Sequence, residues 1–253
     1  PIFCNWAPIT SESTLFLEHP RVMMLTEVVC FVMRLILNCK NTKKKRIFAD
    51  CKIRYMYINA ELFHDFLSHR EVTWLGVDFS KARFTRAGFQ LTQEVILRYF
   101  NDWNMLIISD QKKYDVRMSF RKPVMQYDLS WVTKRNKTVK INNLLSDFIT
   151  IDAVYSEEAI IGYVQNSIIP QSSEYSILFI VESFDEHTKM GTVWVVVVQS
   201  GTRQVVLCEK FMKSPSGFGL RNYWGRVFYN LFFDIQKYAF LRWENLVKGK
   251  GEK

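Results

Sequence analysis

The 253-residue sequence predicts an α/β (α+β) fold, in which helices pack on a mixed sheet, and three observations carry this prediction. Three strand-like runs follow one another between residues 175 and 213, with only short turn-rich segments between them. Segments in which apolar residues recur at helical spacing precede and follow these runs. The chain is 48% apolar and 15% aromatic, which is enough to bury a full core. We therefore expect a carboxy-terminal three-strand antiparallel meander within a larger mixed sheet.

We expect three parts along the chain: an amino-terminal extension over residues 1–54, a single α/β domain over 55–246 and a basic tail over 247–253. The apolar run Val22–Leu37 contains two charged residues and is shorter than the roughly 20 apolar residues that a membrane span needs. A basic cluster follows this run, whereas a signal peptide has its basic residues in front. The extension is therefore either a helix that docks on the domain or a misassigned start, and we expect no transmembrane span.

The first strand of the domain is expected over residues 72–80, an apolar run with β-branched and aromatic residues. A helix is expected over Thr92–Ile108, with the threonine as its N-cap. The segments 116–120 and 128–133 alternate in polarity, which predicts one or two strands. A serine followed by two acids then predicts a capped helix from Ser156 to about Ile169.

The three runs of the meander are expected over residues 175–184, 191–200 and 204–212. Because the turns between them are short, antiparallel hairpins are the economical connection. Val193–Val198 is apolar at every position, so this strand should be covered on both faces. The third run alternates at its end, as an edge or near-edge strand does.

A long amphipathic helix is expected after the meander, with its apolar residues at positions i, i+3, i+4 and i+7. These residues are Leu220, Trp224, Val227, Phe228, Leu231, Phe232, Ile235 and Tyr238. Trp224 and Phe228 should face Val193–Val198.

The glycine-rich stretch ahead of this helix, "SPSGFGLRN", permits two interpretations. Gly217 and Gly219 can supply unusual backbone angles for a tight strand-to-helix turn, with Ser216 as the helix cap and Arg221 paired with an acid. Alternatively Gly217, Gly219, Arg221 and Asn222 form an anion-binding site at the helix start. Because an antiparallel meander precedes the stretch, and no Gly-Lys-Ser/Thr is present, we favour the turn.

No catalytic constellation is evident, and two carboxylates are the remaining candidates. Asp78 and Glu182 each lie near the end of a buried strand, where carboxylates of α/β enzymes often lie. The simpler interpretation is that each caps a turn or pairs with Lys81 or Arg221. In the alternative, an enzyme would gather these two acids with Arg221 and Asn222 at one end of the sheet.

Metal, redox and cofactor sites have no sequence signature. The five cysteines are an odd number without C-x-x-C spacing, and His64 and His69 are five residues apart, which does not place them on one helix face. No G-x-G-x-x-G is present. We expect no metal and no cofactor, and we expect Cys208 to be a small core residue.

The net charge of +9, from 34 basic and 25 acidic residues, is concentrated at the two ends of the chain. Residues 1–54 hold nine Lys or Arg against four Asp or Glu, and residues 237–253 hold five against two. The segment 55–236 holds twenty against nineteen, a net +1. Nucleic-acid binding needs clustered charge on a folded face, so this count argues against a nucleic-acid partner.

The stretches "WLGVDFSKARF", "YFNDWNMLI", "KYDV", "FIVESFDEHTKMGTVWVVV" and "GFGLRNYW" together resemble an uncharacterised family of small proteins from Bacteroidetes. The resemblance covers residues of about 72–235 and says nothing of activity. It implies export, and hence a periplasmic or envelope location, although residues 1–70 depart from the family pattern.

The expected order of elements is also similar to the periplasmic domain of curli-secretion-type lipoproteins and to the amino-terminal domain of Tol-system propeller proteins. Such domains bind and assemble without catalysing, which implies a protein partner and a non-enzymatic interaction or assembly role in a bacterial cell envelope. A small-ligand-binding or hydrolytic enzyme is the alternative.

Overall fold

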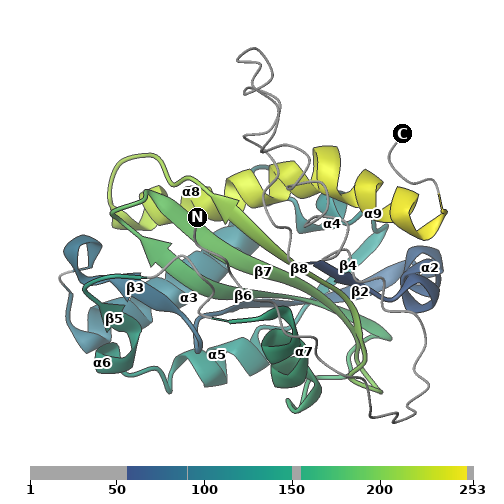
Figure 1. Cartoon of the computed structure of the whole chain (residues 1–253), viewed down its shortest axis with the longest axis horizontal. Coiled ribbons are helices and arrows are strands. Elements are labelled where there is room, and N and C mark those ends of the chain that lie inside the picture. Colours follow the sequence, from purple (N-terminus) through teal and green to yellow (C-terminus); the bar gives the residue numbers. More distant parts are fainter. Residues whose placement is uncertain (1–55, 90, 150–154, 250–253) are drawn as a thin grey trace, which may run out of the picture. The chain divides into compact units, whose positions relative to one another are not determined.

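The structure, a computed structural model, describes residues 56–249 except residue 90 and residues 150–154 (Figure 1). The helix expected over Val22–Leu37 lies outside the described residues.

The described strands form one mixed sheet with helices on both faces, which confirms the α+β fold (Figure 1). The strands are β1 (Met56–Ile58), β2 (Glu71–Asp78), β3 (Arg83–Thr85), β4 (Val124–Tyr127), β5 (Leu145–Ser146), β6 (Tyr175–Asp185), β7 (Met190–Gln199) and β8 (Val205–Lys213). Their order is β1-β8-β7-β6-β2-β4, and β3 pairs with both β6 and β5. β6, β7 and β8 are antiparallel neighbours, so the predicted meander is confirmed. β2 runs parallel to β4 and to β6.

The helical elements are α2 (Ala60–Ser68), η2 (Arg86–Gly88), α3 (Gln93–Ser109), α4 (Val116–Ser119), α5 (Ser130–Asn136), α6 (Ile141–Leu144), α7 (Glu157–Gln165), α8 (Leu220–Asp234), the π-helical turn η3 (Ile235–Ala239) and α9 (Phe240–Val247). Helices α2, α3, α4, α8 and α9 contribute to one hydrophobic cluster, whereas α5 and α7 contribute to a second one. We call the two sides of the sheet the α8 face and the α5/α7 face; the first lies above the sheet and the second below it in Figure 1.

Strand β7 shows how one apolar run builds both clusters. Val193–Val198 is buried throughout, as predicted. Val193, Val195 and Val197 belong to the cluster on the α8 face. Trp194, Val196 and Val198 belong to the cluster on the α5/α7 face. Since full burial of a valine contributes about 1.5–3 kcal/mol, this central strand is a large part of the driving force for folding.

The segments 116–120 and 128–133 were expected as strands, and this prediction was wrong: they form α4 and α5. An aspartate begins each helical turn. The Asp115 carboxylate accepts a hydrogen bond of 2.8 Å from a backbone N–H three residues on, and Asp128 accepts one of 3.0 Å from the N–H two residues on. The strand of this region is β4, which lies between the two helices. These local hydrogen bonds thus favour a helical turn more strongly than an alternation of only a few residues favours a strand.

The two longer predicted helices are present with small changes at their ends. Thr92 occupies the N-cap position of α3 without a side-chain hydrogen bond, whereas Ser156 caps α7 by accepting a bond of 3.2 Å from Ala159. α7 ends at Gln165 and does not reach Ile169. Asn166 and the following serine donate side-chain hydrogen bonds to the carbonyls four residues back, which satisfies the last turn.

The carboxy-terminal helix continues through the π turn η3, which shifts its buried face. Tyr238 was expected in the core and is 62% exposed instead. A π turn makes i→i+5 hydrogen bonds and so inserts one extra residue into the helical repeat. Ala239, Phe240 and Trp243 therefore take the buried positions after Ile235.

Candidate functional site

The sheet splits in two next to β6, and the candidate site lies at this split. β2 pairs with residues 176–180 of β6, and β3 pairs with residues 183–184 of the same strand. Residues 79–82 link β2 to β3 between these two pairings. β4 then continues the sheet beyond β2, whereas β5 continues it beyond β3. We call the residues that meet at this place, 79–83 and 134–144, the sheet fork. In α/β sheets, ligands bind outside the carboxyl ends of parallel strands at such points of divergence.

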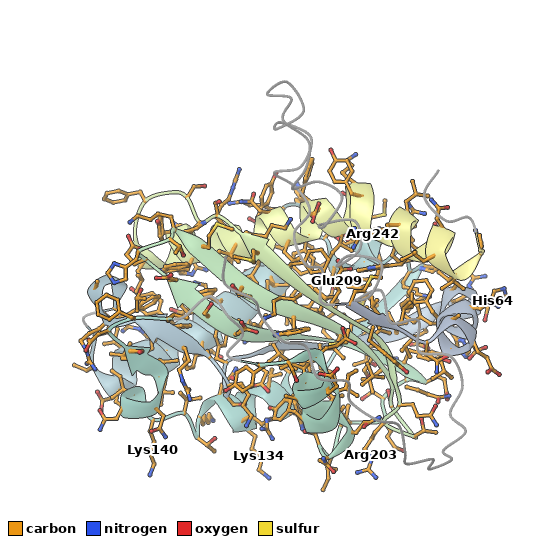
Figure 2. All side chains as sticks on the ribbon, viewed as in Figure 1. His64, Lys134, Lys140, Arg203, Glu209 and Arg242 are labelled. Carbon is orange, nitrogen blue, oxygen red and sulfur yellow. The ribbon has the colours of Figure 1, made fainter. Side chains whose placement is uncertain are left out.

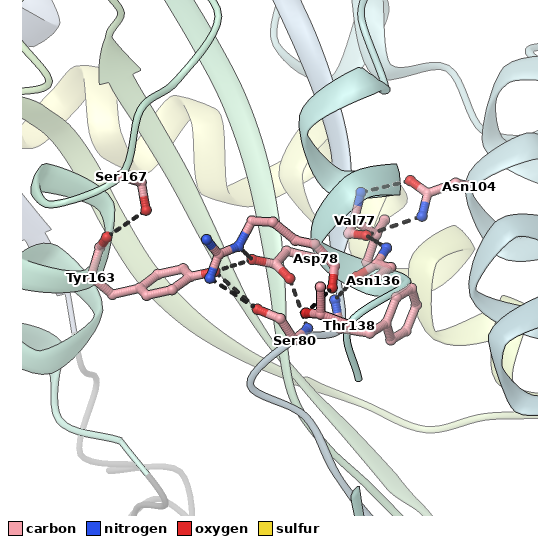
Figure 3. Close-up of polar contacts among 10 residues, drawn as sticks. Val77, Asp78, Ser80, Asn104, Asn136, Thr138, Tyr163 and Ser167 are labelled. Carbon is pink, nitrogen blue, oxygen red and sulfur yellow. Dashed lines mark hydrogen bonds and ion pairs between the residues drawn. The ribbon is translucent and has the colours of Figure 1, made fainter. Parts of the chain in front are cut away.

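Two buried asparagines hold the end of β2 where it enters the fork (Figure 3). Asn104 of α3 accepts a hydrogen bond of 2.7 Å from the Val77 N–H and donates one of 3.0 Å to the Val77 carbonyl. Asn136 of α5 accepts one of 2.7 Å from the Phe79 N–H and donates one of 2.9 Å to Val77. Gly76 makes this approach possible, because a Cβ there would lie 2.6 Å from Asn104 Oδ1. The strand end is therefore rigid.

Asp78, a predicted candidate, is the last residue of β2 and is completely buried. One carboxylate oxygen accepts a hydrogen bond of 2.7 Å from the Ser80 N–H, and the other accepts one from the Tyr163 hydroxyl of α7. The Nε of Arg135 in α5 forms an ion pair with it at 3.4 Å (Figure 3). We call Asp78, Ser80, Arg135 and Tyr163 the Asp78 cluster.

The turn-capping role expected for Asp78 is confirmed, but neither of the expected cations is its ion-pair partner. Arg135 takes that role because α5 packs against β2, whereas Lys81 lies 5.2 Å from the centre of the Tyr163 ring. The Arg135 guanidinium itself lies 4.7 Å from the Tyr163 ring centre and 4.9 Å from that of Trp131. Arg135 thus contacts both the buried carboxylate and two aromatic rings.

The protonation of this cluster limits its chemistry. Burial raises the pKa of the Tyr163 hydroxyl, and the neighbouring Asp78 raises it further, so the phenol stays protonated and donates to the carboxylate. Ser80 Oγ lies 3.0 Å from this phenol oxygen and 3.4 Å from Arg135 Nη2. Neither a protonated phenol nor a guanidinium takes a proton from serine. The cluster therefore does not activate Ser80 as a nucleophile.

Glu182, the second predicted carboxylate, belongs to a separate buried group on the α5/α7 face. It accepts a hydrogen bond of 2.6 Å from the indole N–H of Trp194 and forms an ion pair of 3.0 Å with Lys210. The Lys210 ammonium also lies 4.8 Å from the centre of the Trp194 ring. Glu182 and Asp78 thus lie on the same face but have different partners.

The backbone of the glycine-rich loop agrees with the turn interpretation. Gly217 has a φ of +116° and Gly219 one of +76°, as predicted, and α8 begins directly after Gly219. The expected side-chain cap was wrong: α8 has no side-chain cap, and the Ser216 N–H donates at 3.3 Å to the carbonyl of Tyr223. Since this N–H is bonded to a carbonyl of α8, it is not available to an anion.

Arg221 and Asn222 lie in the first turn of α8 and are exposed. Among the described residues Arg221 has no ion-pair partner, so the predicted pairing with an acid was wrong; its carbonyl accepts a bond of 2.9 Å from Trp103. α8 packs on the α8 face, whereas Asp78 points to the α5/α7 face. The fold does not gather these four residues, as the enzyme alternative required. Trp224 stacks on Phe184 of β6, at 4.5 Å between ring centres. Trp224 and Phe228 belong to the cluster on the α8 face together with Val193, Val195 and Val197 of β7.

Two hollows open at the fork end of the sheet. The smaller, of about 90 Å³, lies in the fork and is lined by Ser80, Ala82, Arg83, Thr138, Val139, Lys140, Asn143 and Leu144. The larger, of about 340 Å³, is lined by Arg86, Phe89, Leu91, Thr92, Ile141, Asn142 and Leu145. Neither lining includes an acidic residue. We call the smaller one the fork hollow.

The basic residues of the fork were missed by sequence reasoning, although a signal for them exists. Residues 79–93 hold three Lys or Arg and no Asp or Glu, and residues 129–146 hold four and none. The net charge of +1 over residues 55–236 does not reveal these basic segments, because acidic residues elsewhere in that range balance their charge. A count in shorter windows would have revealed it.

The described residues contain neither a cluster of metal ligands nor a helix that could span a membrane. No three His, Cys, Asp or Glu side chains there come together as metal ligands. In that same part of the chain, every helix is too short or too polar to cross a bilayer. Cys208 is buried, as predicted, and burial raises the pKa of its thiol.

Comparison with known proteins adds little to this geometry. No family model matches the sequence, and no curated protein matches it. Among solved structures, the chain is similar to a hypothetical protein from Chlamydia trachomatis, with 13% sequence identity over 72% of this chain and 99% of that one, and a TM-score of 0.28. A TM-score this low supports no inference about function, and the resemblance to the Bacteroidetes family stays a prediction.

Proposed function

We propose that the described domain is a non-enzymatic binding module. The observation that carries this proposal is the complete burial of Asp78, whose two oxygens bind Ser80, Tyr163 and Arg135. A catalytic acid or base must reach the proton that it transfers, at about 2.6–3.2 Å in the reactive complex. A carboxylate enclosed by its own fold does not meet that condition.

The second carboxylate and the hollows support the same proposal. Glu182 is 5% exposed and is bound by Trp194 and Lys210. Hydrolases that use paired carboxylates direct both acids toward one substrate-sized cavity. Here the linings of both hollows carry neutral and basic side chains instead.

We further propose that this module takes part in assembly at a bacterial cell envelope through a protein partner. It is supported by the resemblance of stretches such as "GFGLRNYW" and by the likeness in element order to curli-secretion-type and Tol-system domains. Fractionation and in-cell crosslinking in the native organism test it. We expect the chain in the envelope fraction, crosslinked to one defined protein; recovery from the soluble fraction without a crosslinked protein contradicts this proposal.

Activity profiling tests the non-enzymatic proposal against the hydrolase alternative. Full-length wild type and Asp78→Asn are assayed with phosphate esters, carboxylic esters and glycosides, with Asp128→Asn as a matched control at a more exposed aspartate. We expect no turnover above buffer for any of the three proteins, and a lower melting temperature for Asp78→Asn alone. Turnover that disappears in Asp78→Asn, while the melting temperature is kept, overturns the proposal.

A further inference from the structure

We propose that the sheet fork binds the phosphoryl group of a small phosphorylated molecule in the fork hollow. This inference rests on the proposed function, because it assigns a ligand class to a binding module. It is a different site from the glycine-rich loop ahead of α8, on which the sequence alone placed a candidate anion site.

The first support is the segregation of charge. The two segments that meet at the fork lie within residues 79–93 and 129–146, which together hold seven basic residues and no acidic one. The remainder of residues 55–236 has thirteen basic residues against nineteen acidic ones, a net −6. Acidic residues flank both segments at positions 78, 94, 128 and 147, and Asp78 and Asp147 pair with Arg135 and Arg86. Even with these four acids counted, the two segments keep an excess of positive charge, which attracts anions.

The second support is that several of these cations have no acidic partner among the described residues. Lys134, Lys137 and Lys140 are exposed, and none of them forms an ion pair there. Lys134 and Lys140 extend from the same side of the molecule, below α5 and α6 (Figure 2). By contrast, Arg86 at the edge of the fork pairs with Asp147 at 2.9 Å. The lysines carry uncompensated charge that a bound anion would neutralise.

The third support is the chemistry of the fork hollow. Arg83, Lys140 and Asn143, which line the hollow, carry side-chain hydrogen-bond donors and come from two different segments of the chain. Arg83 uses one N–H on the Ala82 carbonyl at 3.2 Å, which leaves further N–H groups for a ligand. The Thr138 hydroxyl donates to the Arg135 carbonyl at 2.7 Å and offers only lone pairs. Guanidinium and ammonium donors without a competing carboxylate favour an anionic oxygen, such as that of a phosphate, over a neutral acceptor.

The size of the fork hollow and the residues around it favour a small phosphorylated molecule over a nucleic acid as the ligand. About 90 Å³ admits a single phosphoryl group, and the neighbouring lysines match a second or third negative charge outside it. Single-stranded nucleic acids need open aromatic faces on which bases stack. At the fork, Arg135 lies over both the Trp131 and Tyr163 rings, so these faces are already covered.

The composition of the fork also argues against a membrane surface. Membrane-binding segments combine lysines with exposed aromatic or aliphatic anchors. Between Lys134 and Lys140 the exposed side chains are Lys137 and Thr138, and the exposed residues in the rest of the fork are Asn142 and Asn143. The exposed Phe148 lies beyond the fork, and its ring stacks on that of His187. Polar neighbours of this kind bind headgroup-sized anions without inserting into lipid.

Calorimetric titration of the full chain with inorganic pyrophosphate tests the inference. The variants are Lys140→Gln and Arg83→Gln, and the matched controls are Lys112→Gln and Arg117→Gln, which change exposed cations outside the fork. We expect saturable binding to wild type, a Kd raised at least tenfold in each fork variant and a Kd within twofold of wild type in each control. Raising the salt concentration from 50 to 300 mM should weaken binding, as screening requires.

Several outcomes overturn the inference. They are no saturable binding to wild type, equal losses in fork variants and controls, or binding only to a single-stranded oligonucleotide or to phosphatidylglycerol vesicles in parallel titrations. Thermal unfolding of every variant separates a lost site from a lost fold. If pyrophosphate binds at the fork and is hydrolysed, the site stands and the non-enzymatic proposal fails; if nothing binds and nothing is hydrolysed, only the inference fails.

Discussion

The Tyr163 hydroxyl and the Arg135 guanidinium make it possible to bury Asp78 as a carboxylate. An isolated buried charge is destabilised by several kcal/mol, and removing one partner of a buried pair leaves this penalty uncompensated. Tyr163 is held by the α7 helix, and its protonated hydroxyl donates to a carboxylate that no solvent reaches. The cluster therefore couples α5, α7 and the end of β2 into one unit.

Tyr163→Phe tests the role of this hydroxyl without changing the ring. We expect the free energy of unfolding in denaturant to fall by about 1–3 kcal/mol, the penalty for an unsatisfied buried charged acceptor. Tyr238→Phe is the matched control, since this tyrosine is 62% exposed and should change stability by less than about 0.5 kcal/mol. Equal effects of the two changes contradict the assigned role.

Glu157 predicts a pH dependence of stability. Burial beside β8, reinforced by the neighbouring Glu158, raises the pKa of this carboxyl from 4.5 to about 7. A raised folded-state pKa means that the fold favours the protonated acid, so its contribution is complete below pH 4.5 and is lost as pH rises through 7. Because the side chain is partly solvated, we expect a loss of only about 1 kcal/mol after screening.

The measurement is denaturant unfolding between pH 4.5 and pH 8. Glu157→Gln should remove this decrease, whereas Glu61→Gln, which changes an exposed first-turn acid of α2, should retain it. Identical pH profiles for wild type and Glu157→Gln show that the carboxyl does not titrate as described.

At the scale of elements, the meander was predictable because its information is local. The strands of Tyr175–Lys213 are long, apolar and joined by short turns, so both their existence and their pairing can be predicted from the sequence. α4 and α5 were not predictable from periodicity, since each is one or two turns long and begins beside an aspartate that accepts a hydrogen bond from a backbone N–H. β3 and β5 contain three and two residues, which is too short for any alternation to show.

The candidate site was predictable only in part. Asp78 could be selected because a carboxylate ends an apolar strand. Its partner Tyr163 is 85 residues further along the chain, and its partner Arg135 comes from a helix that was expected as a strand. Contacts over such separations leave no local pattern. The fork itself arises from strand pairings that no single segment encodes.

Gly76→Ala tests the packing that shapes the end of β2. The φ of Gly76 is +101°, and a Cβ would lie 2.6–2.7 Å from atoms of Asn104, Leu129 and Val132. Backbone strain and overpacking each contribute about 1–3 kcal/mol, so we expect the free energy of unfolding to fall by at least about 2 kcal/mol. Gly201→Ala is the control, because an added Cβ there meets nothing within 4 Å. Full stability of Gly76→Ala contradicts this picture.

Gly219→Val separates the two interpretations of the loop before α8. Its φ is +76°, but nothing lies within 4 Å of an added Cβ, so backbone strain alone should lower the free energy of unfolding by more than about 1 kcal/mol. Pyrophosphate affinity, measured by calorimetry, should be unchanged. A variant that keeps its stability and loses affinity would make the loop, and not the fork, the anion site.

At the scale of the whole described domain, the hydrophobic clusters on the two faces of the sheet differ in size. The cluster on the α8 face joins several helices around stacked rings such as Phe184 and Trp224, whereas the cluster on the α5/α7 face is smaller. At the sheet fork, β6 changes its pairing partner from β2 to β3. The fork hollow and the exposed lysines Lys134, Lys137 and Lys140 lie at the same place, which is where we place anion binding.

Hydrogen–deuterium exchange with and without pyrophosphate tests most directly whether the sheet fork binds an anion, because it reports on the whole described domain in a single experiment. We predict slower amide exchange on ligand addition in residues 79–86 and 134–144, and unchanged exchange in the glycine-rich loop at residues 214–222. Protection of residues 214–222 with no change at the fork would contradict the account.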